Sequence, residues 1–114
     1  MSYLNRDAVL TALSSHIGQG NGIRSVDLVR EITGFPPVTH YGERALRTII
    51  TALRMEGHHI CGLPESGYFI AATPAELDST CEFLYDRAMT TLKQIARMKK
   101  IALPDLRGQM HLPT

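Results

Sequence analysis

Apolar residues recur at helical spacing in four stretches of the chain and alternate with polar residues in another. A first helix is expected to begin after Asn5, a good capping residue, and to end in the glycine-rich residues 18–22. Its inward positions are predicted to be Val9, Leu10, Leu13 and Ile17. After a brief strand at Ile23 and Arg24, Ser25 is expected to cap a second helix that ends at Gly34. The inward positions of the second helix are predicted to be Val26, Leu28, Val29 and Ile32.

The third predicted helix has the clearest division into two faces. It spans about residues 41–56 and follows a turn that Pro36 and Pro37 keep out of the helical conformation. With successive residues ~100° apart, one arc is apolar and contains Ala45, Leu46, Ile49, Ile50 and Leu53. The opposite arc is cationic with short hydroxyls and contains Glu43, Arg44, Arg47, Thr48, Thr51 and Arg54.

A β-hairpin is predicted from two β-rich runs, residues 58–63 and 67–72, which flank a short turn. Alternation places Tyr68 and Ile70 on one face and Phe69 on the other. Residues 73–76 then form a capping box with proline at the first helical position, so a fourth helix is expected to run to about residue 100. Its apolar stripe is predicted to be Leu77, Cys81, Leu84, Tyr85, Ala88, Leu92 and Ile95. The predicted fold class is therefore mainly α with a small β-hairpin, an α+β fold.

Composition favours one small globular domain without a membrane segment. Hydrophobic residues make up 44% of the 114 residues, and no apolar run approaches the ~18 residues that span a bilayer. The first residues lack the features of a signal peptide, so a cytoplasmic location is expected. Charge is uneven, with a net −4 over residues 1–86 and +5 over residues 87–114. The basic end fits either a polyanionic partner or simply a solvated helix end.

His58, His59 and Cys61 raise the question of a metal site. A zinc site needs four ligands, or three and a water, and strand alternation separates His58 from the other two. We therefore interpret this stretch as a structural strand, with Ile60 and Cys61 in the core, and expect no metal. Glycine-rich phosphate loops and assembled nucleophile–base pairs are also missing from the sequence, so neither an enzyme nor a bound cofactor is expected.

The order of helix, helix, arginine-faced helix and hairpin resembles a winged helix-turn-helix domain. Residues 43–47 (ERALR), the helix end LRMEG and the later GY at Gly67 and Tyr68 are similar to patterns in biotin-operon-repressor-type and related bacterial regulators. The resemblance covers roughly residues 5–72 and implies a winged-helix domain at residues 1–72. Residues 73–102 would then form a long C-terminal helix and residues 103–114 a flexible tail.

The resemblance implies that the third helix enters the major groove of duplex DNA. Carried over by position, the candidate DNA-binding residues are His40, Tyr41, Arg44, Arg47, Thr48, Thr51 and Arg54. The hairpin would be the wing, although its acidic tip at Glu65 would be repelled by phosphate and also fits a structural cover.

Two functions are therefore kept open. The first is a bacterial or phage transcriptional regulator that binds duplex DNA through the third helix. It would act as a homodimer whose two copies join through residues 74–98. The second is a replication-accessory or protein-interaction module, in which the winged helix is a scaffold. In the second case a tail peptide would dock on a sliding clamp, because it is similar to short clamp-binding peptides. That peptide consists of Gln109, Met110, His111 and Leu112.

Overall fold

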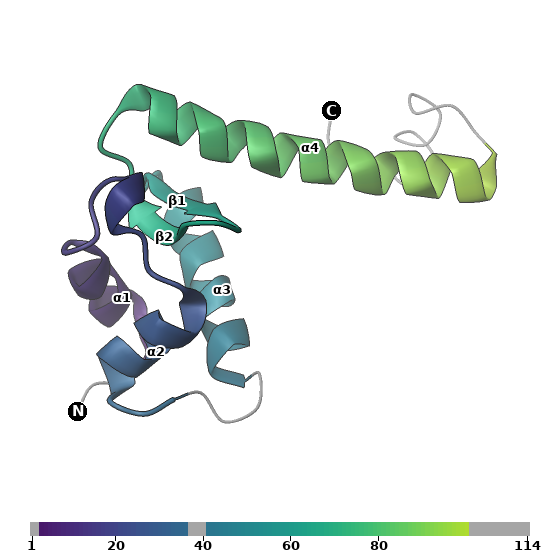
Figure 1. Cartoon of the computed structure of the whole chain (residues 1–114). Helices are drawn as coiled ribbons and strands as arrows, with labels where there is room; N and C mark the ends of the chain where they lie inside the picture. The colour runs from purple at the N-terminus through teal and green to yellow at the C-terminus, as the bar shows by residue number, and fades with distance from the viewer. Residues whose placement is uncertain (1–2, 37–40, 101–114) are drawn as a thin grey trace. The chain divides into compact units, whose positions relative to one another are not determined.

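The computed structural model describes residues 3–36 and 41–100, and over these residues it is mainly helical (Figure 1). The elements in chain order are α1 (Arg6–Leu13), the 3-10 turn η1 (Gln19–Asn21), α2 (Ser25–Thr33), α3 (Tyr41–Met55), β1 (Ile60–Leu63), β2 (Gly67–Ile70) and α4 (Pro74–Lys99). The predicted fold class, mainly α with a small hairpin and a long C-terminal helix, is confirmed. The chain divides into two compact units, Met1–Thr80 and Cys81–Thr114, so the first turns of α4 belong to the first unit.

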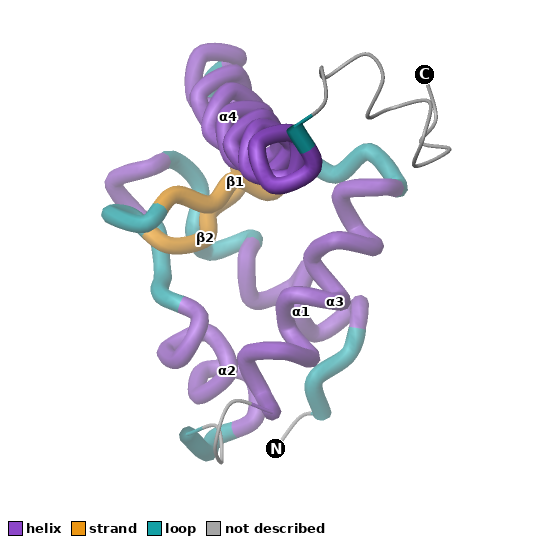
Figure 2. The backbone as a smooth tube through the Cα atoms, turned by 90° about the vertical axis from the view of Figure 1, so that its right-hand side faces the viewer, coloured by secondary structure: helices purple, strands orange, loops and turns teal. Residues whose placement is uncertain are grey.

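The core of the first unit lies between α1, α2 and α3, with α3 in contact with both other helices. Both views place these three helices on one side of the hairpin (Figure 2). The buried cluster consists of Val9, Leu13, Leu28, Val29, Ile32, Leu46, Ile50, Leu53 and Ile60. Each of these side chains contributes roughly 1.5–3 kcal/mol if fully removed from water. Most inward positions predicted for the first three helices are confirmed, but Val26 is wrong because its side chain is exposed.

The first helix is shorter than its hydrophobic pattern predicts. The cap is confirmed, since the side chain of Asn5 accepts a hydrogen bond of 2.9 Å from the backbone N–H of Ala8. The helix ends at Leu13, however, and Ile17 is 51% exposed rather than on a buried helical face. The chain leaves the helix because His16 and Gly18 pair with β2, each through a 2.8 Å backbone hydrogen bond to Ile70.

Both ends of α2 are fixed by particular residues. Gly34 ends the helix in the left-handed conformation at φ +83°, as predicted. Ser25 is the first residue of the helix rather than its cap, and its hydroxyl donates a 2.8 Å hydrogen bond to Oε1 of Glu43. This bond joins the start of α2 to the first turn of α3, and so fixes one helix against the other.

The hairpin pairs β1 with β2 in antiparallel register, Cys61 opposite Phe69. Ile23 adds a single bridge to β2, because it exchanges backbone hydrogen bonds of 2.9 and 2.8 Å with Tyr68. The brief strand predicted at Ile23 is thus reduced to one residue. Ile60 belongs to the helical core and Tyr68 packs against it, whereas Phe69 and Cys61 are fully buried outside that cluster. The predicted alternation and the core positions of Ile60 and Cys61 are confirmed.

The first turns of α4 bond to the hairpin. Thr80 is only 2% exposed, and its hydroxyl accepts a 3.3 Å hydrogen bond from the N–H of Gly62. The thiol of Cys61 donates to the carbonyl oxygen of Glu76 at 3.6 Å. These bonds make Pro74–Thr80 part of the first unit and explain why Cys61 is buried.

The predicted capping box at the start of α4 is half formed. The N–H of Glu76 donates to Oγ1 of Thr73 at 3.2 Å, as the motif requires. The Glu76 carboxylate instead accepts hydrogen bonds from the backbone N–H groups of Gln19 at 3.0 Å and Ala72 at 2.8 Å. These two bonds lower the pKa of Glu76 below its ordinary value, and the bond from Gln19 has the larger effect. Glu76 therefore ties η1 to the start of α4.

The rest of α4, from Cys81 on, is a regular helix that ends where predicted. It ends at Lys99, and Lys100 takes a left-handed φ of +57°. Several residues of its predicted apolar stripe are exposed, among them Cys81, Leu84, Tyr85 and Ala88. No helix in the described parts of the chain is both long and apolar enough to cross a membrane. The predicted tail, residues 103–114, and the docking peptide within it lie outside the described residues.

Candidate nucleic-acid interface

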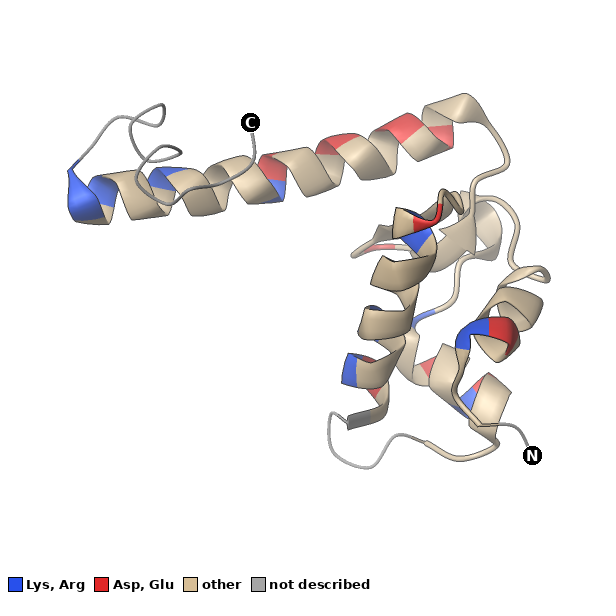
Figure 3. Cartoon of the chain, turned by 180° about the vertical axis from the view of Figure 1, so that it is seen from behind, with Lys and Arg blue, Asp and Glu red and all other residues tan. Residues whose placement is uncertain are grey.

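Helix α3 presents a cationic, hydroxyl-bearing face to solvent. Leu46, Ile50 and Leu53 are at most 1% exposed and hold the helix against the core. The helical period turns the opposite face outward, and Figure 3 shows the arginine positions spaced along α3. Four of the predicted DNA-binding residues are exposed on this face, namely Arg44, Arg47, Thr48 and Thr51.

The orientation of α3 is fixed at both ends by polar contacts. At its start, Glu43 accepts the hydrogen bond from Ser25 described above. Just beyond its last turn, Nε of Arg6 donates to Oε1 of Glu56 at 3.1 Å, which ties the helix end to α1. The hydrogen bond lowers the pKa of Glu56 and raises that of Arg6. The core thus holds α3 along its length, and these contacts join its two ends to α2 and α1.

Arg54 differs from the other arginines of the helix. Its side chain is half-buried, and its Nε donates a 2.7 Å hydrogen bond to the carbonyl oxygen of Ile60 at the start of β1. It was predicted as a DNA contact with Arg44 and Arg47, yet its Nε makes a structural contact to the hairpin. The sequence could not separate the three, because they share one arc of the helix.

Arg47 lines a hollow that sequence reasoning did not predict. Its other lining residues are Ser25, Glu43 and Tyr68, and its volume is about 180 Å³. Arg47 therefore shares this hollow with one acidic residue, one serine and one tyrosine. Ser25 and Tyr68 come from α2 and β2, and no local signal in the sequence links them to α3.

Among the other predicted DNA-binding residues, Thr48 and Tyr41 belong to α3. Thr48 donates its hydroxyl to the carbonyl oxygen of Arg44 at 3.2 Å, and its oxygen lone pairs stay open to solvent. Tyr41 is the first residue of α3, while its side chain and the whole of His40 lie outside the described residues. At the hairpin tip, Pro64 and Glu65 are exposed.

The histidines and cysteines that the structure describes do not form a cluster. Within residues 3–36 and 41–100, no three His, Cys, Asp or Glu side chains come together as metal ligands would. Cys61 is buried against Glu76, while His59 is exposed and Nε2 of His58 lies 4.0 Å from Oε1 of Glu56.

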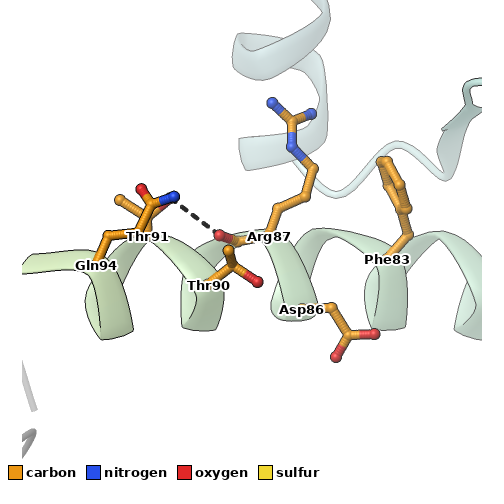
Figure 4. Close-up of a pocket in the computed structure, with 6 residues that line it drawn as sticks. All are labelled: Phe83, Asp86, Arg87, Thr90, Thr91 and Gln94. Atoms are coloured by element: carbon orange, nitrogen blue, oxygen red, sulfur yellow. Dashed lines mark hydrogen bonds between the residues drawn. The ribbon is translucent and has the colours of Figure 1, made fainter. Parts of the chain in front are cut away.

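A second hollow, of about 300 Å³, lies along one side of α4 (Figure 4). The guanidinium of Arg87 lies 5.7 Å from the centre of the Phe83 ring, a cation–π distance. The hydroxyl of Thr91 donates to the carbonyl oxygen of Arg87 at 3.0 Å. Asp86, Thr90 and Gln94 complete the lining. These polar, single-helix walls fit a surface contact better than an enclosed ligand site.

Comparison of the chain with protein-family models, with curated proteins and with solved structures gives no match.

Proposed function

We propose that this chain is a small winged-helix DNA-binding protein of the cytoplasm, a bacterial or phage transcriptional regulator. In this proposal it binds duplex DNA as a homodimer, with α3 in the major groove. The observation that carries the proposal is the exposed face of α3 with Arg44 and Arg47, on a helix whose opposite face is held in the core by Leu46, Ile50 and Leu53. The succession of three helices and a hairpin, with Ile23 bridging to β2, supports the winged-helix assignment.

Arginine suits this task for two reasons. Its planar guanidinium matches the O6 and N7 acceptors of guanine, and it binds phosphate oxygens equally well. Arg44 and Arg47 are three residues apart, so they lie almost one above the other on the same side of α3. The neighbouring hydroxyl of Thr51 is a short donor of the kind that contacts phosphates beside a recognition helix, whereas that of Thr48 already donates to the carbonyl oxygen of Arg44.

The hairpin contributes less in this proposal. Its tip carries Glu65, which phosphate repels, and its two faces are used by the helical core and by the first turns of α4. We therefore assign the hairpin a structural part: it supports α3 through the bond between Arg54 and Ile60.

Titration against duplex DNA at two salt concentrations tests the proposal. The double variant Arg44→Ala/Arg47→Ala is expected to bind more weakly than the wild type, with a flatter dependence of affinity on salt, because fewer counterions are released. Arg30→Ala is the control for the loss of an exposed positive charge elsewhere, since it removes one arginine from the exposed side of α2. The control should bind like the wild type.

Equal binding by the double variant and the wild type at both salt concentrations would contradict the proposal. If the wild type bound no duplex DNA at all, the use of this domain as a protein-interaction module would be favoured instead.

A further inference from the structure

We infer that two copies of α4 pair antiparallel, so that the acidic first half of each helix faces the basic second half of its partner. This inference rests on the homodimer proposed above and adds its orientation and register. The homodimer alone does not say whether the two helices run the same way. The distribution of apolar and charged residues along α4 answers that question.

The apolar stripe of α4 follows a seven-residue repeat. One row of the stripe, position a, holds Cys81, Ala88 and Ile95. The next row, position d, holds the apolar residues Leu77, Leu84 and Met98, with the polar Thr91 between the last two. Tyr85 and Leu92 widen the stripe at position e. Rows a and d with this spacing are the seam of paired helices.

The stripe lacks cover over much of its length. Tyr85 is 64% exposed and Met98 77%, and Cys81 and Ala88 are exposed as well. Leu77, Leu92 and Ile95 in the same stripe are half-buried, and the exposed apolar side chains beside them lie at seam spacing, which indicates a contact surface. A second copy of the same helix offers the same row, and two rows related by a two-fold axis cover each other.

The charges on α4 separate completely between its two halves. Residues 74–86 carry Glu76, Asp78, Glu82 and Asp86 and no basic residue. Residues 87–99 carry Arg87, Lys93, Arg97 and Lys99 and no acidic residue. Figure 3 shows this order, with red positions toward the start of the helix and blue ones at its end.

This separation favours one orientation over the other. Of these charges, Asp78 and Lys99 at position e flank the seam. Antiparallel helices place each Asp78 beside the partner's Lys99, whereas parallel helices leave the two residues at opposite ends of the pair. Single exposed ion pairs add only about 0–1 kcal/mol. The charges therefore select the orientation, while the apolar stripe supplies the affinity.

The same reasoning selects a register. Antiparallel seams place a positions opposite d positions. If Leu84 lies opposite the partner's Ile95, then Cys81 lies opposite the partner's Met98, and Asp78 at position e lies opposite the partner's Lys99. A shift of seven residues in one direction would place Asp78 opposite a leucine, and in the other direction would place Tyr85 opposite Lys99. Only the register with Leu84 opposite Ile95 pairs both the charges and the apolar residues.

Cysteine cross-linking of the full chain tests the orientation. In the proposed pair the two Cys81 thiols are about 25 Å apart along the helices, at ~1.5 Å per residue. In a parallel pair they would lie side by side, within reach of a disulfide. Cys61 is fully buried and should not react. Met98→Cys places a thiol opposite the partner's Cys81, at an exposed position where the change should not disturb the fold.

Under mild oxidation, Met98→Cys is expected to give a disulfide-linked dimer. Wild type and the control Cys81→Ser/Met98→Cys are expected to stay unlinked. Efficient cross-linking of either would mean parallel helices and would overturn the inference. A dimer in light scattering in which Met98→Cys also stays unlinked would overturn it as well, because the helices would then pair elsewhere or in another register.

A charge exchange provides a second, independent measurement. Lys99→Glu should raise the dimer dissociation constant roughly fivefold to tenfold, because both symmetry-related pairs become repulsive. Asp78→Lys/Lys99→Glu should restore it, which a parallel pair cannot explain because the two residues are then at opposite ends. Failure of the double variant to restore the dissociation constant would contradict the register.

A monomer at tens of micromolar would exclude the dimer and this inference together. The role proposed for α3 would remain testable by the DNA titration, which does not depend on α4.

Discussion

Nε of Arg54 donates a 2.7 Å hydrogen bond to the carbonyl oxygen of Ile60, and so joins the last turn of α3 to the first residue of β1. The carbonyl accepts from a charged donor at a half-buried site, where such a bond is stronger than a neutral one. Arg54 is therefore a residue that holds the hairpin to the helix, although it shares a face with two arginines that are exposed.

Substitution of Arg54 should thus affect stability. Arg54→Ala is expected to lower the free energy of unfolding by about 1.5–3 kcal/mol, the usual contribution of a hydrogen bond to a charged group. The control is Arg44→Ala, an exposed change on the same helix that should stay within about 0.5 kcal/mol of the wild type. Urea denaturation of the wild type, Arg54→Ala and Arg44→Ala measures the change in the free energy of unfolding for each variant. Equal stabilities of the two variants would show that the bond to Ile60 contributes nothing.

The close approach of residues 22–23 to the hairpin predicts a graded series of glycine substitutions. A Cβ on Gly67, at φ +76°, would lie 2.3 Å from the carbonyl oxygen of Ile23, and one on Gly22 would lie 2.1 Å from that of Ser66. Gly57, at φ +99°, has open space around the same position. Gly57→Ala should therefore cost only the left-handed strain, about 1–2 kcal/mol.

Gly67→Ala should cost clearly more than Gly57→Ala, because backbone atoms must move in addition to the strain. Gly22 has an ordinary φ of −61°, so Gly22→Ala measures the cost of the steric clash without left-handed strain. Gly20→Ala, with nothing within 4 Å, is the control for the substitution itself. Thermal unfolding of these glycine variants and the wild type gives the order of their stabilities. A Gly67→Ala variant no less stable than Gly57→Ala would mean that Ile23 does not pack this closely on β2.

The carboxylate of Glu76 predicts a loss of stability in acid. Its pKa is lowered in the folded chain, chiefly by the N–H of Gln19, so its contribution is present above the ordinary carboxyl pKa. That contribution is lost as the pH falls through the lowered pKa of the folded state. In Glu76→Gln this pH-dependent part should be missing, and the stability difference from the wild type should shrink toward acid.

Urea unfolding from about pH 7 to about pH 3 measures this difference. Glu82→Gln on the exposed part of α4 is the matched control and should keep the acid profile of the wild type. A constant difference between Glu76→Gln and the wild type across this range would contradict the assignment.

Local signals in the sequence were sufficient for most of the elements. Asn5, Gly34, Gly57 and Thr73 act within a few residues of themselves, and the structure has them at the predicted helix ends. The apolar face of α3 also followed from its period alone. In both cases the physical cause is contained within one helix, so the sequence of that helix was enough.

Long-range pairing explains what the sequence did not predict. The apolar spacing of Ile17 fits a continued helix, but the backbone at residues 16–18 pairs instead with Ile70, more than fifty positions away. Val26 matches an inward position and yet is exposed, because the partners around α2 decide which of its sides is covered. Likewise, Arg54 differs from Arg47 by a contact with β1 that no local signal in the sequence predicts.

The most specific prediction for the proposed interface concerns Arg47. Its side chain is exposed, so Arg47→Ala should leave folding intact and act on DNA alone. If Arg47 reads a base edge, its loss should cost roughly 1–3 kcal/mol of binding and relax the preference at one base pair. If it anchors a phosphate, binding to all sequences should weaken alike and the salt slope should flatten by about one.

Arg47→Lys separates the two cases. Lysine keeps the charge but not the planar fork, so it should largely replace a phosphate contact and should not replace a paired contact to guanine. The measurement is selection of preferred duplexes by wild type and both variants, followed by titration of the best duplex at two salt concentrations. If Arg47→Ala neither weakens binding nor changes the preferred sequence, Arg47 does not contact DNA, and the interface must be assigned to another face of the protein.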